Sequence, residues 1–236
     1  YTHIAWGLTS QGKFQIEAYN PVTNEGMIYY IGSGVAGHQI SHSMGVEIDY
    51  LEMKDLSRAE NWIVGSNQIG SGNILLLNGT HAEFGDGHSP DITNTHISID
   101  LASGATNTSN EEYIMYYKCK SETFTIGTYT GTGVAGNFVE TKDVNGVARK
   151  PRRVVIKRID STGDWIVFDS AKPLYNFIRL NSSAAQNTDA SYLPVFSLGG
   201  FSLTGAGGTW IYWNAAGGQY LYLVEFDTDN TGTTGS

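Results

Sequence analysis

Residues 81–91 hold the densest set of side chains in this sequence that could bind a metal or transfer a proton. The segment contains two histidines and three carboxylates within eleven positions. The four that we consider as ligands of a divalent cation are His81, Glu83, Asp86 and His88. Their spacing matches no established metal motif, and Asp86-Gly87 is ordinary turn chemistry. A solvated loop is therefore the competing interpretation, and we predict no cofactor beyond this candidate structural cation.

The same carboxylates raise the question of catalysis. Paired acidic side chains can hydrolyse glycosidic bonds, but the sequence gives no evidence that two of them face one another. The single cysteine, Cys119, lies between Lys118 and Lys120 with no histidine or asparagine nearby in the sequence. We interpret it as a strand residue rather than a nucleophile. The sequence thus favours a non-enzymatic protein and keeps a polysaccharide-degrading enzyme as an alternative.

Three clustered aromatic residues are the predicted ligand-binding site. Trp210, Tyr212 and Trp213 lie between two glycine-rich segments, and the corresponding part of the first half of the chain is polar. Strand alternation would place Trp210 and Tyr212 on one face and Trp213 on the other. Exposed aromatic rings provide rigid contact area for sugars or proteins. The alternative is that these rings pack against their own sheet.

A basic run is the predicted contact for another subunit or an anionic partner. Six of the fourteen basic residues lie within ten positions. They are Arg149, Lys150, Arg152, Arg153, Lys157 and Arg158, and the first four are the predicted contact residues. A charged strand edge that resists aggregation is the alternative. The formal net charge of −9 argues against nucleic acid as a partner. No apolar run reaches the length of a membrane span, so membrane insertion is not predicted.

An internal repeat organises the elements that must position these residues. Residues 164–170 closely resemble residues 61–66, with Trp165 and Trp62 separated by 103 positions. Further matches in the same order join Leu77-Asn78 to Leu180-Asn181, residues 113–117 to 220–224, and Phe14, Ile16 and Tyr19 to Phe124, Ile126 and Tyr129. Searching for repeats first avoids an incorrect fold assignment. We predict Trp62, Trp165, Tyr113 and Tyr220 as core residues of the two copies.

The fold predicted from this pattern is all-β. Short β-rich runs every 8–15 residues are separated by Gly, Asn, Asp and Ser, which is typical of β-sandwiches. We expect two tandem β-sandwich (jelly-roll or concanavalin-like) domains related by internal duplication. Residues 14–120 form a degenerate first repeat, 121–228 the second repeat and 229–236 a flexible tail. Residues 1–13 are the closing strand either of a preceding repeat or of the first sandwich. The segment Tyr220–Phe226 is apolar on both faces and is predicted to be a central strand.

One block of the second copy carries a family resemblance. Residues 157–170 contain Lys157-Arg158 and Trp165 with Asp169-Ser170, and Leu180-Asn181, Gly200-Phe201 and Asn214 with Tyr220 follow in order. This order resembles a β-sandwich repeat found in tandem in tail fibres and other virion proteins of tailed bacteriophages, similar to legume-lectin and glucanase sandwiches. The match covers residues 124–227 well. The first copy has no counterpart of the Phe168-Asp169 pair.

The resemblance implies a virion or extracellular setting, tandem copies, and glycan binding or oligomeric assembly. It carries over no catalytic residue. The leading expectation is an oligomeric virion surface component, such as a tail fibre, that contacts other virion proteins and host-surface glycan. The alternatives are a purely structural virion module, such as a capsid decoration or fibre-shaft protein, and the polysaccharide-degrading enzyme. Fold analogy alone does not decide among them.

Overall fold

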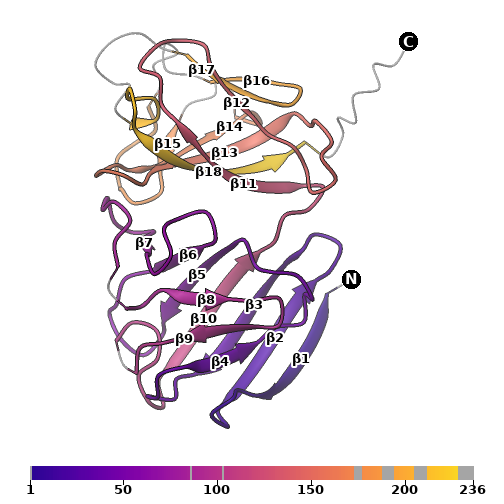
Figure 1. Ribbon diagram of the computed structural model, residues 1–236, viewed down its shortest axis with the longest axis vertical. Coiled ribbons are helices and arrows are strands. Elements are labelled where there is room, and N and C mark those ends of the chain that lie inside the picture. Colours follow the sequence, from indigo (N-terminus) through magenta and orange to yellow (C-terminus); the bar gives the residue numbers. More distant parts are fainter. Residues whose placement is uncertain are drawn as a thin grey trace. The chain divides into compact units, whose positions relative to one another are not determined.

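The computed structural model describes residues 2–85, 87–102, 104–172, 177–187, 194–204 and 212–227, and its regular elements are β-strands. The all-β prediction is confirmed. The chain forms two compact units, which Figure 1 shows with their strands labelled. Unit 1 comprises Tyr1–Gly79 and Glu83–Cys119, and unit 2 comprises Thr80–Ala82 and Lys120–Ser236. No helix in the described part of the chain is long and apolar enough to cross a membrane.

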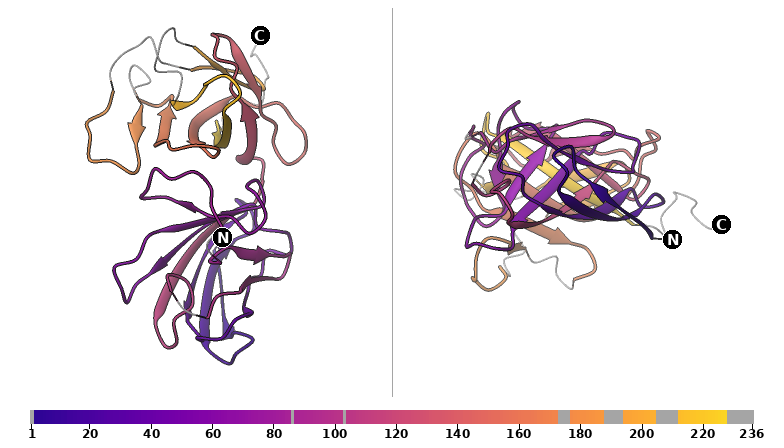
Figure 2. Two further views of the ribbon diagram at one scale, coloured as in Figure 1. Left: turned by 60° about the vertical axis from the view of Figure 1, so that its left-hand side comes forward. Right: turned by 90° about the horizontal axis from the view of Figure 1, so that it is seen from below.

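Unit 1 contains two antiparallel sheets. Its ten strands are β1 (His3–Leu8), β2 (Phe14–Asn20), β3 (Glu25–Ile31), β4 (His38–Ser41), β5 (Tyr50–Asp55), β6 (Ile63–Ser66), β7 (Leu75–Leu76), β8 (Pro90–Ile92), β9 (His96–Ile99) and β10 (Glu112–Lys118). The larger sheet has the order β1-β2-β3-β10-β5-β6-β7, and the smaller has the order β4-β9-β8. Figure 2 shows the same strands from two further directions.

The core of unit 1 follows from strand alternation. On β10 the side chains of Tyr113, Met115 and Tyr117 are buried, whereas those between them are not. They share one hydrophobic cluster with Ile40 of β4 and Ile97 of β9. Because both sheets contribute to this cluster, one face of the larger sheet packs on the smaller one, as expected for two-layer β packing. We call the opposite face of the larger sheet the outer face.

Unit 2 also contains a larger and a smaller antiparallel sheet. Its strands are β11 (Phe124–Thr130), β12 (Asn137–Glu140), β13 (Pro151–Arg158), β14 (Trp165–Asp169), β15 (Ile178–Arg179), β16 (Val195–Ser197), β17 (Gly200–Leu203) and β18 (Gln219–Phe226). The sheet orders are β11-β18-β13-β14-β15 and β12-β17-β16. The prediction of a central strand is confirmed, because β18 pairs with β11 on one side and β13 on the other.

The same aromatic pair recurs in both units. In unit 1 the rings of Tyr30 and Tyr113 stack with centroids 5.1 Å apart, and in unit 2 Tyr129 and Tyr220 stack at the same distance. Each pair joins neighbouring strands, β3 with β10 and β11 with β18. These contacts make β3 the counterpart of β11. The sequence match of Phe14 with Phe124 is therefore wrong, because Phe14 lies one strand earlier, on β2.

A buried asparagine also recurs. Asn107 and Asn214 are fully buried and follow the smaller sheet of their units. The Oδ1 atom of Asn107 accepts a hydrogen bond from the Ser33 amide at 2.8 Å, and that of Asn214 accepts one from the Thr132 amide at 2.9 Å. The Nδ2 atoms donate to the carbonyls of Val35 and Val134. Each asparagine thus fixes the glycine-rich loop that follows the first strand of the aromatic pair, because its amide satisfies backbone groups that would otherwise be unpaired.

The first thirteen residues form no separate domain. Strand β1 is the edge strand of the larger sheet of unit 1 and pairs with β2 along its whole length, from His3 opposite Tyr19 to Leu8 opposite Phe14. The predicted tail at 229–236 lies outside the described residues.

Candidate functional site

The predicted aromatic site is not a cluster of exposed rings. Trp213 is only 2% exposed, and its ring meets Phe168 and Phe177 edge-on with centroids 5.5 and 5.4 Å away. The expectation that Trp213 contacts a ligand is therefore wrong. Tyr212 is partly buried against the same cluster, with the Arg179 guanidinium 5.8 Å from its ring centre. Trp210 lies outside the described residues.

The predicted basic run is largely neutralised within unit 2. Arg152 and Arg153 both pair with Glu225, at 2.8 and 2.9 Å. Arg149 pairs with the buried Asp143 at 2.6 Å, and its guanidinium holds the pKa of that carboxyl below its usual value against the opposing effect of burial. Lys150 is half-buried, and its carbonyl accepts a hydrogen bond from the amide of residue 227. These pairs leave the run far less cationic than its sequence indicates.

Lys157, within that run, is fully buried on β13. Its Nζ atom donates a 2.7 Å hydrogen bond to the carbonyl of Gly163, in the turn before β14. Burial lowers the pKa of Lys157 to about 8, although Asp164 opposes this effect. The corresponding Lys54 of unit 1 likewise donates to backbone carbonyls, those of Asp55 and Glu60. Each lysine therefore stabilises the turn that follows its strand by donating hydrogen bonds to backbone carbonyls of that turn.

The lowered pKa of Lys157 predicts a pH-dependent stability. The unfolded lysine keeps its proton up to about pH 10.5, whereas the folded one loses it near pH 8. Between these values the unfolded state binds more protons at this position, so the contribution of Lys157 to the free energy of unfolding should rise with pH by on the order of 2–3 kcal/mol. Lys157→Met should remove this rise. Denaturant unfolding from pH 7 to pH 10 measures it, and an unchanged pH slope in the variant would contradict the assignment.

The predicted metal loop does not assemble a metal site in the described residues. No three His, Cys, Asp or Glu side chains gather there closely enough to hold an ion. The Glu83 carboxylate accepts a hydrogen bond from the Gly70 amide at 2.7 Å, and the His88 ring bonds the hydroxyl of Thr106 at 3.1 Å. His81 is exposed, and Asp86 lies outside the described residues.

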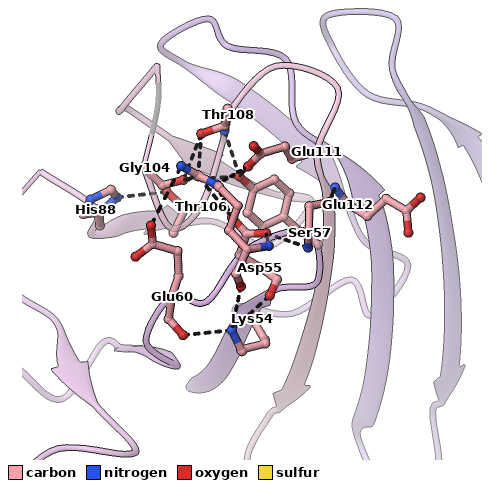
Figure 3. A network of polar contacts seen from close by, with 12 residues as sticks. Lys54, Asp55, Ser57, Glu60, His88, Gly104, Thr106, Thr108, Glu111 and Glu112 are labelled. Carbon is pink, nitrogen blue, oxygen red and sulfur yellow. Dashed lines mark hydrogen bonds and ion pairs between the residues drawn. The ribbon is translucent and has the colours of Figure 1, made fainter.

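Figure 3 shows the polar network to which His88 belongs, at the end of β5 and the loop before β10. Arg58 is its centre and ion-pairs with Asp55 at 3.1 Å and Glu111 at 2.6 Å. The same guanidinium donates to the Gly104 carbonyl and the Thr108 hydroxyl at 2.7 Å each. The buried Asp55 carboxylate also accepts the amides of residues 57 and 58. Because these groups bond one another, the network fixes the loop after β5 and the loop before β10. It does not present these groups to a ligand.

The predicted core aromatics differ between the units. Trp165, Tyr113 and Tyr220 are fully buried. Trp62 is only partly buried, so its placement in the core is wrong. Its ring instead stacks on Tyr116 with centroids 6.5 Å apart and planes inclined by 23°. Tyr116 belongs to the outer face and is 45% exposed.

Beside Tyr116 lies a groove that the sequence did not predict. It has a volume of about 380 Å³ and belongs to unit 1. Its floor is one row of the larger sheet, in which Ala18, Met27, Tyr116 and Glu52 lie opposite one another on β2, β3, β10 and β5. The remaining lining residues are Thr2, Tyr19, Asn20, Glu25, Gly26, Tyr50, Tyr117 and Lys118. The volume lies in the range of small-molecule sites, about 300–1,000 Å³.

The polar groups of this groove are held in place by one another. The Tyr50 hydroxyl donates to Glu52 at 2.7 Å, and the Lys118 amine lies 3.7 Å from the Glu25 carboxylate. An aromatic floor with acceptors and donors at its rim suits a ligand that has both an apolar face and several hydroxyl groups. Sequence reasoning missed the groove because all but one of its lining residues come from four strands, β2, β3, β10 and β5, which only strand pairing brings together.

Comparison with known proteins gives a family without an assigned activity. A family model described as a domain of unknown function, DUF7483, matches residues 19–227. No curated protein and no solved structure matches the chain. The family match spans both units and begins after most of the β1–β2 hairpin. Because the match covers most of the sequence, the chain belongs to the DUF7483 family.

Proposed function

We propose that this protein is a non-enzymatic surface component of a tailed-bacteriophage virion that holds host-surface carbohydrate in the groove beside Tyr116. The groove carries the proposal, because it combines a half-exposed ring that is stacked on Trp62 with the polar side chains of Glu25, Glu52 and Lys118. A sugar ring can lay its C–H face on Tyr116 while its hydroxyls bond the rim. The virion setting rests on the resemblance of residues 124–227 to tandem virion repeats.

A variant of Tyr116 tests the proposed function. Tyr116→Ala should weaken carbohydrate binding at least tenfold, since aromatic anchors dominate contacts of this kind. The measurement is a glycan array followed by titration calorimetry with the best ligand. The matched control is Phe138→Ala, which removes a ring of similar exposure, 49% against 45%, from unit 2. The proposal is wrong if no glycan binds, or if the control loses as much affinity as Tyr116→Ala.

The polysaccharide-degrading alternative has one observation in its favour. Two carboxylates, Glu25 and Glu52, line the same groove. Glycoside hydrolysis needs an acid and a base or nucleophile on opposite sides of the bond. If bound glycan is cleaved and Glu52→Gln stops cleavage while binding persists, the enzymatic reading replaces the binding one. Binding without release of reducing ends would support the non-enzymatic proposal.

A further inference from the structure

The β1–β2 hairpin of unit 1 has its polar side toward its own core. The side chain of Gln15 makes two hydrogen bonds with the backbone of Ser41 on β4, at 2.9 and 3.1 Å. The buried Glu17 carboxylate accepts the Ser43 amide and the hydroxyl of Tyr117. The inner side of the hairpin is therefore held to the rest of unit 1 by hydrogen bonds of polar side chains. The apolar side chains of the hairpin must point the other way, because successive residues alternate between faces.

That outward side is strongly exposed. Trp6 is 79% exposed, Ile4 69%, Leu8 68% and Phe14 44%. The register places Leu8 opposite Phe14 and Trp6 opposite Ile16. We call these five residues the hairpin patch. It continues across β3 and β10 through the apolar residues Tyr29, Ile31 and Ile114 of the outer face.

The hairpin patch is at the upper end of what an isolated subunit usually exposes. A whole aromatic side chain presents on the order of 150–250 Å², but only 79% of Trp6 and 44% of Phe14 is exposed. With its aliphatic members, the patch therefore reaches on the order of 500–600 Å², whereas the largest apolar patch of a typical monomer is about 300–600 Å². A standard interface buries about 800 Å² on each partner. The hairpin patch supplies most of that area, and Tyr29, Ile31 and Ile114 of the outer face adjoin it.

The composition of the patch indicates what covers it. No charged side chain belongs to it, although the chain carries a formal net charge of −9. Charge complementarity with a basic partner therefore cannot direct binding here. A second copy offers the same apolar surface, and a two-fold axis brings two identical surfaces into contact. Two sheets can then pack face to face at about 10 Å with interleaved side chains.

We propose that the hairpin patch is the self-association surface of this protein, where two copies pack the outer faces of their larger sheets with Trp6 near the two-fold axis. The groove beside Tyr116 begins two residues further along β2, at Ala18, and extends to the strand ends at Asn20 and Lys118. It therefore lies at the rim of this contact. The inference goes beyond the proposed carbohydrate binding, because dimer formation requires no ligand.

Mass measurement tests the proposal directly. The full chain should be a dimer by sedimentation or light scattering at micromolar concentration. Trp6→Glu should raise the dissociation constant of the dimer at least tenfold, since central aromatic residues dominate interfaces. The fold should persist, because the Trp6 side chain is mostly outside the core. Ile4→Lys is a second disrupting variant. Val22→Glu is the matched control, because Val22 is 78% exposed but lies in the turn after β2.

The salt dependence of the dimer distinguishes the hairpin patch from a charged interface. A dimer held by apolar contact should persist at high salt, whereas one held by the arginines of β13 should weaken. The proposal is overturned if the wild-type chain is monomeric, or if Val22→Glu weakens the dimer as much as Trp6→Glu. Flotation of a monomeric chain with liposomes, lost in Trp6→Glu, would instead assign the patch to a membrane surface. Carbohydrate binding by the Trp6→Glu monomer would leave the proposed function standing.

Discussion

Replacing Trp165 with alanine is expected to lower the free energy of unfolding of unit 2 by about 3–5 kcal/mol, the usual loss for a large aromatic side chain in a core. Trp165 is fully buried on β14, and its amide donates to Asn181 at 2.9 Å. The alanine variant keeps that main-chain bond. The loss therefore reports the removal of the indole from the core.

The chain contains its own control for this prediction. Trp62 occupies the corresponding position, and its amide donates to Asn78 at 3.0 Å, but its ring is partly exposed on Tyr116. Trp62→Ala should therefore cost less than about 2 kcal/mol, because less apolar surface returns to water. Denaturant titration of both variants provides the comparison. Equal losses would show that the two positions are equally buried in solution and would contradict the difference in burial between Trp165 and Trp62.

The second large effect is expected at Asn214. Asn214→Ala should destabilise unit 2 by about 2–4 kcal/mol, because it removes three hydrogen bonds of a fully buried side chain, each worth about 0.5–1.5 kcal/mol. The groups that lose a partner are the Thr132 amide, the Asn137 side chain and the Val134 carbonyl. No apolar packing replaces these bonds, since alanine is too short to reach the loop.

Asn107→Ala is the matched variant in unit 1. It removes the partner of the Ser33 amide, the His38 ring and the Val35 carbonyl, so a loss of similar size is expected. Calorimetric unfolding of the two single variants and the double variant measures these losses. A loss below about 1 kcal/mol in both units would show that water replaces the asparagine side chain. The hydrogen bonds from the asparagine to the glycine-rich loop would then not be needed for stability.

The all-β class was predictable because alternation and turn residues are local signals. The burial of Trp165 and the central place of β18 were also predictable. Each lies in a run of consecutive apolar residues, which indicates a strand that is buried on both faces. The correspondence of Phe14 with Phe124 failed because β2 and β3 have similar alternation, and only strand pairing distinguishes them. The register of Tyr30 with Tyr113 and of Tyr129 with Tyr220 resolves it.

The candidate sites were less predictable, because their outcome depends on contacts between distant segments. Two arginines of the basic run, Arg152 and Arg153, pair with Glu225, which lies more than seventy positions later. The ring of Trp213 enters the core because the described part of its segment turns rather than running as a strand. The hairpin patch was visible as alternation in β1 and β2. Which side faced the core was decided by Gln15 and Glu17, whose partners Ser41 and Ser43 lie on β4 and in the loop after it.

Residue-resolved hydroxyl-radical footprinting of the full chain tests both uses of the outer face together. We predict that oxidation of Trp6, Leu8 and Phe14 falls as protein concentration rises, because these side chains become covered in the dimer. Oxidation of Tyr116 should fall further when a bound carbohydrate is added. If Trp6 is oxidised equally at every concentration and no carbohydrate protects Tyr116, the outer face of unit 1 is not a contact surface, and both proposals are wrong.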